Sequence, residues 1–221
     1  MTAAELIERY NAGERDFPRV NLTGADLTGA TLTEANLRGA DLTGATLTGA
    51  NLTGATLTGA TLYRADLYRA DLFRANLAGA RLTEADLTDA NLYRANLTEA
   101  NLTEADLTEA RLTEARLTRA DLTGATLTGA NLTGARLTGA TLNWASHDLV
   151  SAILFGAAGD CEAKRQLAGL VIVSRDWCWR TFASLDLDIE LRAWAIAVLA
   201  PYIQDGDTAP AILRRAASEV A

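Results

Sequence analysis

A strict five-residue period constrains this 221-residue chain more than any other feature. From Leu22 to Leu142 a leucine stands at every fifth position without exception, which makes 25 units. From Ala25 to Ala140 an alanine stands two residues before each leucine. Such self-similarity is typical of repeat architectures, and a chain of near-identical units leaves little room for a catalytic site.

No straight secondary-structure element accommodates this period. In an α-helix, which turns about 100° per residue, leucines five apart would spread around the whole cylinder. In a straight strand an odd spacing would send successive leucines to opposite faces. Alanine and leucine within a unit are two apart, as one strand face requires. The conflict disappears if each unit is a short strand followed by a corner, so that the chain coils and the coils stack as a solenoid.

The residues around each leucine support corners. Threonine follows most leucines, and a β-branched residue suits an outward position on a pleated surface. Glycine is common at the next position, where it reaches positive φ at low cost; examples are Gly24, Gly29, Gly44, Gly49, Gly54 and Gly59. Asn, Asp or Thr usually precedes leucine, and these side chains bond readily to nearby backbone groups.

The run from Val20 to about Ala145 resembles the pentapeptide-repeat family, through units such as ADLTG at 25–29, ANLTG at 50–54, ADLYR at 65–69 and ANLTE at 100–104. The resemblance implies a mainly β fold, a right-handed quadrilateral parallel β-helix with four units per coil. Leucine would take the central inward position and alanine the second inward position. The residues at the corners also change in blocks of four units, as if whole coils had been chosen.

Twenty-five units predict about six coils, and at about 4.8 Å per stacked strand the shaft would be about 30 Å long. Members of the family usually mix Phe with Leu at the central position, whereas every unit from 22 onward has Leu. This uniformity favours a designed or consensus-derived array; the alternative is a natural protein with recently duplicated repeats.

The two ends differ from the repeat, which predicts three regions. Residues 1–19 contain Leu6, Ile7 and Tyr10 at helical spacing and predict a short helix over the first coil. Residues 20–145 form the solenoid. Residues 146–221 show signals for helices at about 147–157, from Asp160, from Asp186 or Asp188 to Pro201, and from Thr208, and they hold Trp177, Trp179 and Phe182. This helical domain would cap the last coil or form a homodimer contact, since solenoids need caps.

The charge of the chain bounds its partners. The formal net charge is −8, so direct binding to nucleic acid phosphates is not expected. Acidity raises the alternative of a DNA mimic, because some members of the resembled family imitate duplex DNA and inhibit DNA gyrase. Ten arginines among fourteen acidic residues in 20–145 make the shaft a poor mimic. We expect Arg64 to stack on Glu84 and Arg69 on Asp89 as surface ion pairs.

The chain offers no catalytic, cofactor-binding or metal-binding motif. Ser146, His147 and Asp148 are adjacent, and neighbours on a helix do not face one another, so they make no triad. Cys161 and Cys178 are too few for a disulfide framework, which suggests reduced thiols in a cytoplasmic protein. No apolar run approaches the roughly 20 residues of a membrane span.

One group of surface residues differs from the background. Aromatic residues replace the outward threonine in four units, and an arginine follows each of them; the residues are Tyr63, Arg64, Tyr68, Arg69, Phe73, Arg74, Tyr93 and Arg94. Phe73 and Tyr93 are 20 apart and would stack on neighbouring coils. The group is either a contact patch for a partner or cross-strand packing with guanidinium stacking.

These observations predict a non-enzymatic structural or scaffold protein that requires no cofactor, ligand or partner. The alternative function is a DNA-mimicking inhibitor of gyrase or topoisomerase, and the remaining alternative is an enzyme.

Overall fold

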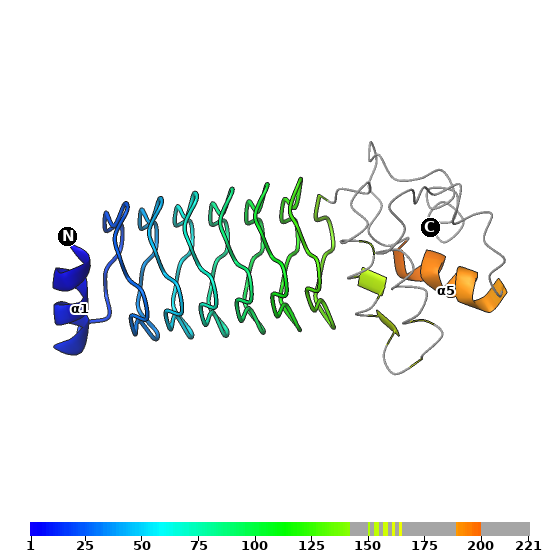
Figure 1. Ribbon diagram of the computed structural model, residues 1–221, viewed down its shortest axis with the longest axis horizontal. Coiled ribbons are helices and arrows are strands. Elements are labelled where there is room, and N and C mark those ends of the chain that lie inside the picture. The colour runs from blue at the N-terminus through cyan, green and yellow to red at the C-terminus, as the bar shows by residue number, and fades with distance from the viewer. Residues whose placement is uncertain are drawn as a thin grey trace.

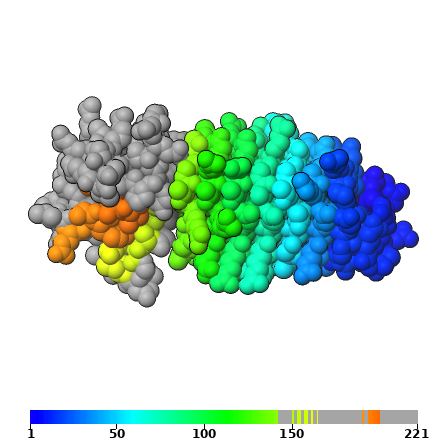
Figure 2. Space-filling model, turned by 180° about the vertical axis from the view of Figure 1, so that it is seen from behind, coloured from blue at the N-terminus to red at the C-terminus, as the bar shows by residue number. Residues whose placement is uncertain are grey.

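The computed structural model describes residues 1–141, 150, 153–154, 157–158, 161, 164 and 189–199. These residues form an elongated molecule with helix α1 (Ala3–Asn11) at one end, a stack of coils in the middle and helix α5 (Ile189–Leu199) at the other end (Figure 1). In the space-filling view the coils appear as parallel bands across the shaft (Figure 2).

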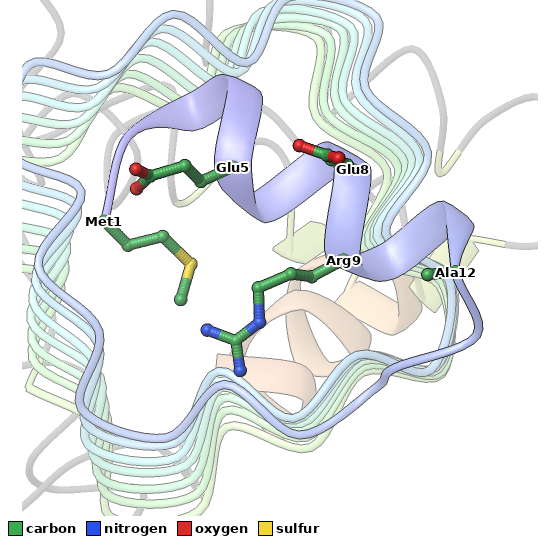
Figure 3. A pocket seen from close by; sticks show the side chains of 5 residues that line it. All are labelled: Met1, Glu5, Glu8, Arg9 and Ala12. Carbon is green, nitrogen blue, oxygen red and sulfur yellow. The ribbon is translucent and has the colours of Figure 1, made fainter.

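Each coil contains 20 residues. Parallel bridges join the residue before Phe17 or before a shaft leucine to the residue 20 positions later, from Asp16–Asn36 in regular steps of five to Asp121–Thr141. Four five-residue units therefore make one turn of the solenoid, as the family resemblance implied. Viewed along the shaft, the coils lie nearly behind one another and have a four-sided outline (Figure 3).

The backbone hydrogen bonds explain why a five-residue unit is stable. In the unit from Asp41 to Ala45, three amides donate to carbonyls of the neighbouring coils, at 2.9 Å from Asp41, 2.7 Å from Leu42 and 2.8 Å from Gly44. The amide of Ala45 closes the corner on the carbonyl of Leu42 at 3.0 Å. The remaining amide, that of Thr43, donates to Oδ1 of Asp41 at 3.0 Å. All five amides of the unit are thus satisfied, as buried or half-buried backbone requires.

The bond from the side chain before leucine is general. Every Asn or Asp that precedes a shaft leucine from 21 to 131 accepts the amide two residues later, at 2.9–3.3 Å. These are Asx turns, which imitate a backbone turn. The expectation that these side chains bond nearby backbone groups is confirmed for Asn and Asp.

The second residue after each leucine from Leu22 to Leu137 has positive φ. The corner glycines lie between +62° and +70°, from Gly24 to Gly139. Only this residue of the corner is left-handed, and the bond from the next amide to the leucine carbonyl closes the turn, which is the pattern of a type II turn. Arg, Glu or Asp occupies the same conformation at thirteen corners, with φ of 53–59°, although a side chain there is unfavourable.

The core is a column of leucine and alanine. Leucines from Leu32 to Leu122 are 0% exposed, and the alanines between Ala35 and Ala120 are at most 1% exposed. Both inward positions predicted from the sequence are confirmed. Exposure rises only at the ends of the column, where Ala25 and Ala135 are partly exposed.

The bridged shaft begins one unit before residue 20, at which the sequence placed its start. Phe17 stands five residues before Leu22 and is 2% exposed in the same core cluster. Asp16 makes the first bridge, and Arg19 has the left-handed corner conformation, with φ of 56°. The sequence RDFPR at 15–19 escaped detection because it lacks both leucine and glycine, but phenylalanine occupies the central position.

Helix α1 lies across the first coil, as the sequence predicted. A capping box between Thr2 and Glu5 starts the helix. Leu6 is fully buried and Tyr10 is 6% exposed, whereas Ile7 is only partly buried. The hydroxyl of Tyr10 donates to the carbonyl of Thr33 at 3.0 Å. That carbonyl belongs to the first coil, where no preceding coil supplies an amide, so α1 satisfies one open backbone group as well as covering the core.

At the opposite end, Ala195 and Leu199 of α5 belong to the same buried cluster as Leu137 of the shaft. Helix α5 lies within the helix predicted from Asp186 or Asp188 to Pro201. Val150, Ile153 and Leu154, in the predicted helix 147–157, are helical. Trp177, Trp179, Phe182 and the helix predicted from Thr208 lie outside the described residues, so the C-terminal cap as a domain stays a prediction.

Candidate contact surface

The eight aromatic and arginine residues do not form one flat patch. Tyr63, Tyr68 and Phe73 belong to consecutive units and therefore lie on three successive faces of one coil. Only Phe73 and Tyr93, which are 20 residues apart, share a face. The eight residues together form an aromatic belt around the middle of the shaft, and no single flat partner could touch all of it.

Each arginine of the aromatic belt stacks on the ring that precedes it. The guanidinium carbon lies 4.9–5.0 Å from the ring centroid in all four pairs, which are Arg64 on Tyr63, Arg69 on Tyr68, Arg74 on Phe73 and Arg94 on Tyr93. Exposed cation–π pairs stabilise by about 0.5–1 kcal/mol. The rings of Phe73 and Tyr93 also stack on each other, with centroids 5.6 Å apart and an interplanar angle of 28°. The sequence predicted this cross-coil stacking.

Two arginines of the aromatic belt make the ion pairs expected from the sequence, each with a carboxylate one coil later. Nε of Arg64 lies 2.6 Å from Oε2 of Glu84, and the hydroxyl of Tyr63 donates to Oε1 of the same carboxylate at 3.1 Å. The hydrogen bond from Arg64 lowers the pKa of Glu84 below its ordinary value. Arg69 contacts Asp89 at 3.4 Å. Both ion pairs expected from the sequence are therefore present.

The sequence reasoning missed two further ion pairs with the same 20-residue spacing. Nε of Arg94 lies 2.7 Å from Oε2 of Glu114, whose Oε1 accepts the Tyr93 hydroxyl at 3.2 Å. The hydrogen bond from Arg94 lowers the pKa of Glu114. Arg119 contacts Glu99 at 3.4 Å. Applying the 20-residue spacing to every corner residue would have found both.

Arg74 differs from the other belt arginines. The corner residue one coil later is Arg94, so Arg74 meets a like charge where the others meet a carboxylate. Within the described part of the chain it makes a cation–π contact and no ion pair. Phe73, Arg74, Tyr93 and Arg94 are thus the members of the aromatic belt that lie together on one face.

A shallow groove of about 530 Å³ lies beside α1 at the end of the first coil (Figure 3); Met1, Glu5, Glu8, Arg9 and Ala12 line it. Arg9 already donates from Nε to Glu14 at 2.7 Å. The hydrogen bond from the Thr2 backbone lowers the pKa of Glu5. Glu5 and Arg9 are therefore already engaged by groups of the chain itself, and Met1, 40% exposed, adds apolar surface to the groove.

A smaller cavity of about 160 Å³ lies at the other end of the shaft, between the last units and the C-terminal helical residues. The described residues that line it are Leu132, Gly134, Ala135, Leu137, Ile153, Ala157 and Val198. None of these described lining residues has a titratable side chain.

The described residues contain no group of three His, Cys, Asp or Glu side chains that could hold a metal ion. Cys161 is an exposed free thiol, while Ser146, His147, Asp148 and Cys178 lie outside the described residues. Among the described residues, no helix is both long and apolar enough to cross a membrane.

Comparison with known proteins identifies the repeat. The family described as pentapeptide repeats, with eight copies, matches residues 16–49, 35–72, 50–89, 70–108 and 105–143. Together these segments span 128 of the 221 residues. No curated protein sequence matches the chain.

Several solved structures are similar to it. A pentapeptide repeat protein (Rfr23) from the cyanobacterium Cyanothece 51142 is 28% identical over 62% of this chain and 93% of its own, with a TM-score of 0.44. HetL of Nostoc sp. strain PCC 7120, a pentapeptide repeat protein involved in heterocyst differentiation regulation, is 31% identical over 65% of this chain and 96% of its own, with a TM-score of 0.23. QnrB1, a plasmid-mediated fluoroquinolone resistance protein, is 24% identical over 58% of this chain and 67% of its own, with a TM-score of 0.41.

Pentapeptide repeat proteins form right-handed quadrilateral β-helices, and the 20-residue bridge spacing and the buried Leu and Ala positions of this chain agree with that fold. With more than half of its length matched by the repeat, this chain belongs to the pentapeptide-repeat family.

Proposed function

We propose that the protein is a non-enzymatic structural repeat protein whose shaft acts as a rigid scaffold and requires no cofactor or ligand. The observation that carries this proposal is the filled interior. Leucines from Leu32 to Leu122 are fully buried in one continuous cluster, so side chains of the chain itself occupy the space that a barrel or cleft would give to a substrate.

The surface supports the same proposal. Each arginine of the aromatic belt stacks on the ring of the preceding residue. Glu84 and Glu114 each accept hydrogen bonds from an arginine and from a tyrosine hydroxyl. Carboxylates that are exposed and paired lack the burial that tunes acids and bases for catalysis. We therefore assign the aromatic belt to packing between coils.

The proposal extends to the origin and the ends of the chain. Leucine at 25 successive central positions favours a consensus-derived or designed array of about six coils. Residues 146–221 would form an α-helical cap, with a homodimer contact as a second role. The exposed free thiol of Cys161 suits a reducing, cytoplasmic setting.

Thermal unfolding tests the scaffold proposal. Circular dichroism and light scattering should show one species whose β-signal persists to about 90 °C, the range of hyperstable proteins. A melting temperature in the range of about 45–65 °C, typical of ordinary domains, would contradict a consensus scaffold.

The second candidate function is inhibition of DNA gyrase or topoisomerase by DNA mimicry. One face of the shaft favours it. This acidic face consists of residues 26–29 and of the residues that follow them at steps of 20, up to 126–129. It carries six carboxylates and one arginine, namely Asp26, Asp66, Asp86, Asp89, Asp106, Glu109 and Arg69.

The density of charge argues for the scaffold instead. From Asp26 to Glu109 the acidic face runs over about four coils, or about 20 Å at about 4.8 Å per coil. Its net charge of −5 is then spread at about one charge per 4 Å, whereas duplex DNA carries about one per 1.7 Å. A supercoiling assay decides: inhibition at micromolar protein supports the mimic, and full supercoiling at that concentration removes it.

A further inference from the structure

The shaft carries opposite charges on opposite faces. The basic face consists of residues 16–19 and of the residues that follow them at steps of 20, up to 136–139. It carries five arginines and two acids, which are Arg19, Arg38, Arg116, Arg119, Arg136, Asp16 and Glu99. Its net charge is +3, against −5 on the acidic face. The two faces are ten residues apart, which is half a coil, so they lie on opposite sides of the shaft. The intervening faces carry −2 and 0.

Most of these charges are not paired within the described part of the chain. On the acidic face the structure shows one ion pair, Asp89 with Arg69, and on the basic face one, Arg119 with Glu99. Among the described residues, the acids of the acidic face that make no ion pair are Asp26, Asp66, Asp86, Asp106 and Glu109, and the arginines of the basic face that make none are Arg19, Arg38, Arg116 and Arg136. All nine side chains are exposed or half-exposed.

The spacing of the two faces also matches. Asp86 and Asp106 are one coil apart, and so are Arg116 and Arg136. Each pair is therefore separated by about 4.8 Å along the shaft. Two parallel shafts, one shifted by about one and a half coils, bring the aspartate pair of one opposite the arginine pair of the other. The pairs of a single chain never meet, because the body of the shaft lies between them.

We propose that the acidic face binds the basic face of a second copy of the chain, so that shafts associate side by side. The occupant is a second copy because the complementary charge, at the same spacing, is present on the chain itself. Such a contact joins two different surfaces and is therefore heterologous. Each added copy leaves a free acidic face and a free basic face, so the association continues beyond the dimer.

The contact should be weak and sensitive to salt. It is built from exposed charges, and the net charge of −8 opposes it. Screening lengths fall from about 10 Å in 0.1 M salt to about 3 Å in 1 M salt, so association should occur in the first condition and disappear in the second.

The test compares two triple variants with the same charge and the same chemistry. Asp66→Asn/Asp86→Asn/Asp106→Asn neutralises the acidic face. The control, Asp41→Asn/Asp71→Asn/Asp121→Asn, makes the same change at the same position of the unit on the other two faces. Both variants should fold, because asparagine occurs naturally at this position and makes the same bond to the backbone, as at Asn51 and Asn101.

Sedimentation and light scattering at increasing protein concentration, in about 0.1 M and about 1 M salt, measure the average mass. We expect the native chain and the control triple to exceed twice the 23.4 kDa monomer mass at low salt, and the acidic-face triple to lose at least tenfold in association constant. Three results would overturn the proposal: a native chain that stays monomeric at millimolar concentration, a mass that stops at the dimer, or equal behaviour of the two triples.

Discussion

Replacing one leucine in the middle of the shaft with alanine tests the account of the core most directly. Leu72 is fully buried, and the leucines one coil away on either side, Leu52 and Leu92, are buried as well. The substitution removes three carbon atoms, which at about 0.8 kcal/mol per buried methylene corresponds to about 2.4 kcal/mol of lost transfer free energy.

The cavity left behind adds to this loss. The amide of Leu72 donates to the coil after it at 2.8 Å, and the amide of Leu52 donates to Asp71 at 2.8 Å. Since hydrogen bonds fix the coils on both sides, the wall cannot collapse into the space. Leucine-to-alanine substitutions at buried sites cost about 2.7–5 kcal/mol depending on such relaxation, and we expect Leu72→Ala to cost about 4 kcal/mol.

Denaturant unfolding and native-state hydrogen exchange measure the loss. Leu22→Ala is the matched control, because Leu22 lies in the first coil, is 2% exposed, and has a complete coil on one side only. Its wall can relax, so the loss should be about 2–3 kcal/mol. The reasoning fails if Leu72→Ala costs less than about 1 kcal/mol or if the end position is the more sensitive one.

Three other perturbations test the corners, the charges and the N-terminal cap. Gly44→Ala should lower the free energy of unfolding by about 1 kcal/mol, measured by urea unfolding. An added Cβ meets nothing within 4 Å, so the cost comes from the φ of +62° alone. An unchanged free energy of unfolding would mean that the left-handed corners do not require glycine. The hydrogen bond from Arg64 lowers the pKa of Glu84 below its ordinary value of 4.5. The stability that this ion pair contributes is therefore complete above pH 4.5 and is lost as the pH falls through the lower pKa of the folded state. Glu84→Gln should flatten that part of the stability–pH curve, and an unchanged curve would contradict the pairing. Tyr10→Phe removes the 3.0 Å bond to Thr33 and should cost about 0.5–1.5 kcal/mol, with faster hydrogen exchange confined to the first coil; equal exchange throughout the shaft would refute the capping role.

Much of the fold could be predicted because the period is a geometric constraint. Leucines five apart share an interior only if the chain turns a corner in each unit, and the corner glycines supply the conformation that this requires. Sequence reasoning failed at Phe17, where the first unit lacks the residues that define the others. The period places Arg, Glu or Asp at some of the corners, but it does not predict that these residues adopt the left-handed conformation, because local propensity opposes it.

The surface was predicted less completely. Stacking of Phe73 on Tyr93 and the pairing of Arg64 with Glu84 follow from the 20-residue coil, and both are present. For the eight residues of the aromatic belt, the sequence left a contact patch and packing between coils as alternatives, and it placed only Phe73 and Tyr93 on one face. Consecutive units lie on different faces of the solenoid, so a surface feature is recognised only by comparing residues one coil apart.

The 20-residue coil gives five-residue insertions and deletions an unusual effect. Adding or removing one unit preserves the leucine column, but it turns everything downstream through a quarter of a revolution. Side chains that had formed one stripe would then be divided between two sides of the shaft. Adding four units lengthens the shaft by about 4.8 Å and leaves every stripe aligned. The number of repeats thus determines how the surface side chains before and after an insertion are rotated relative to each other, whereas the leucine core stays the same.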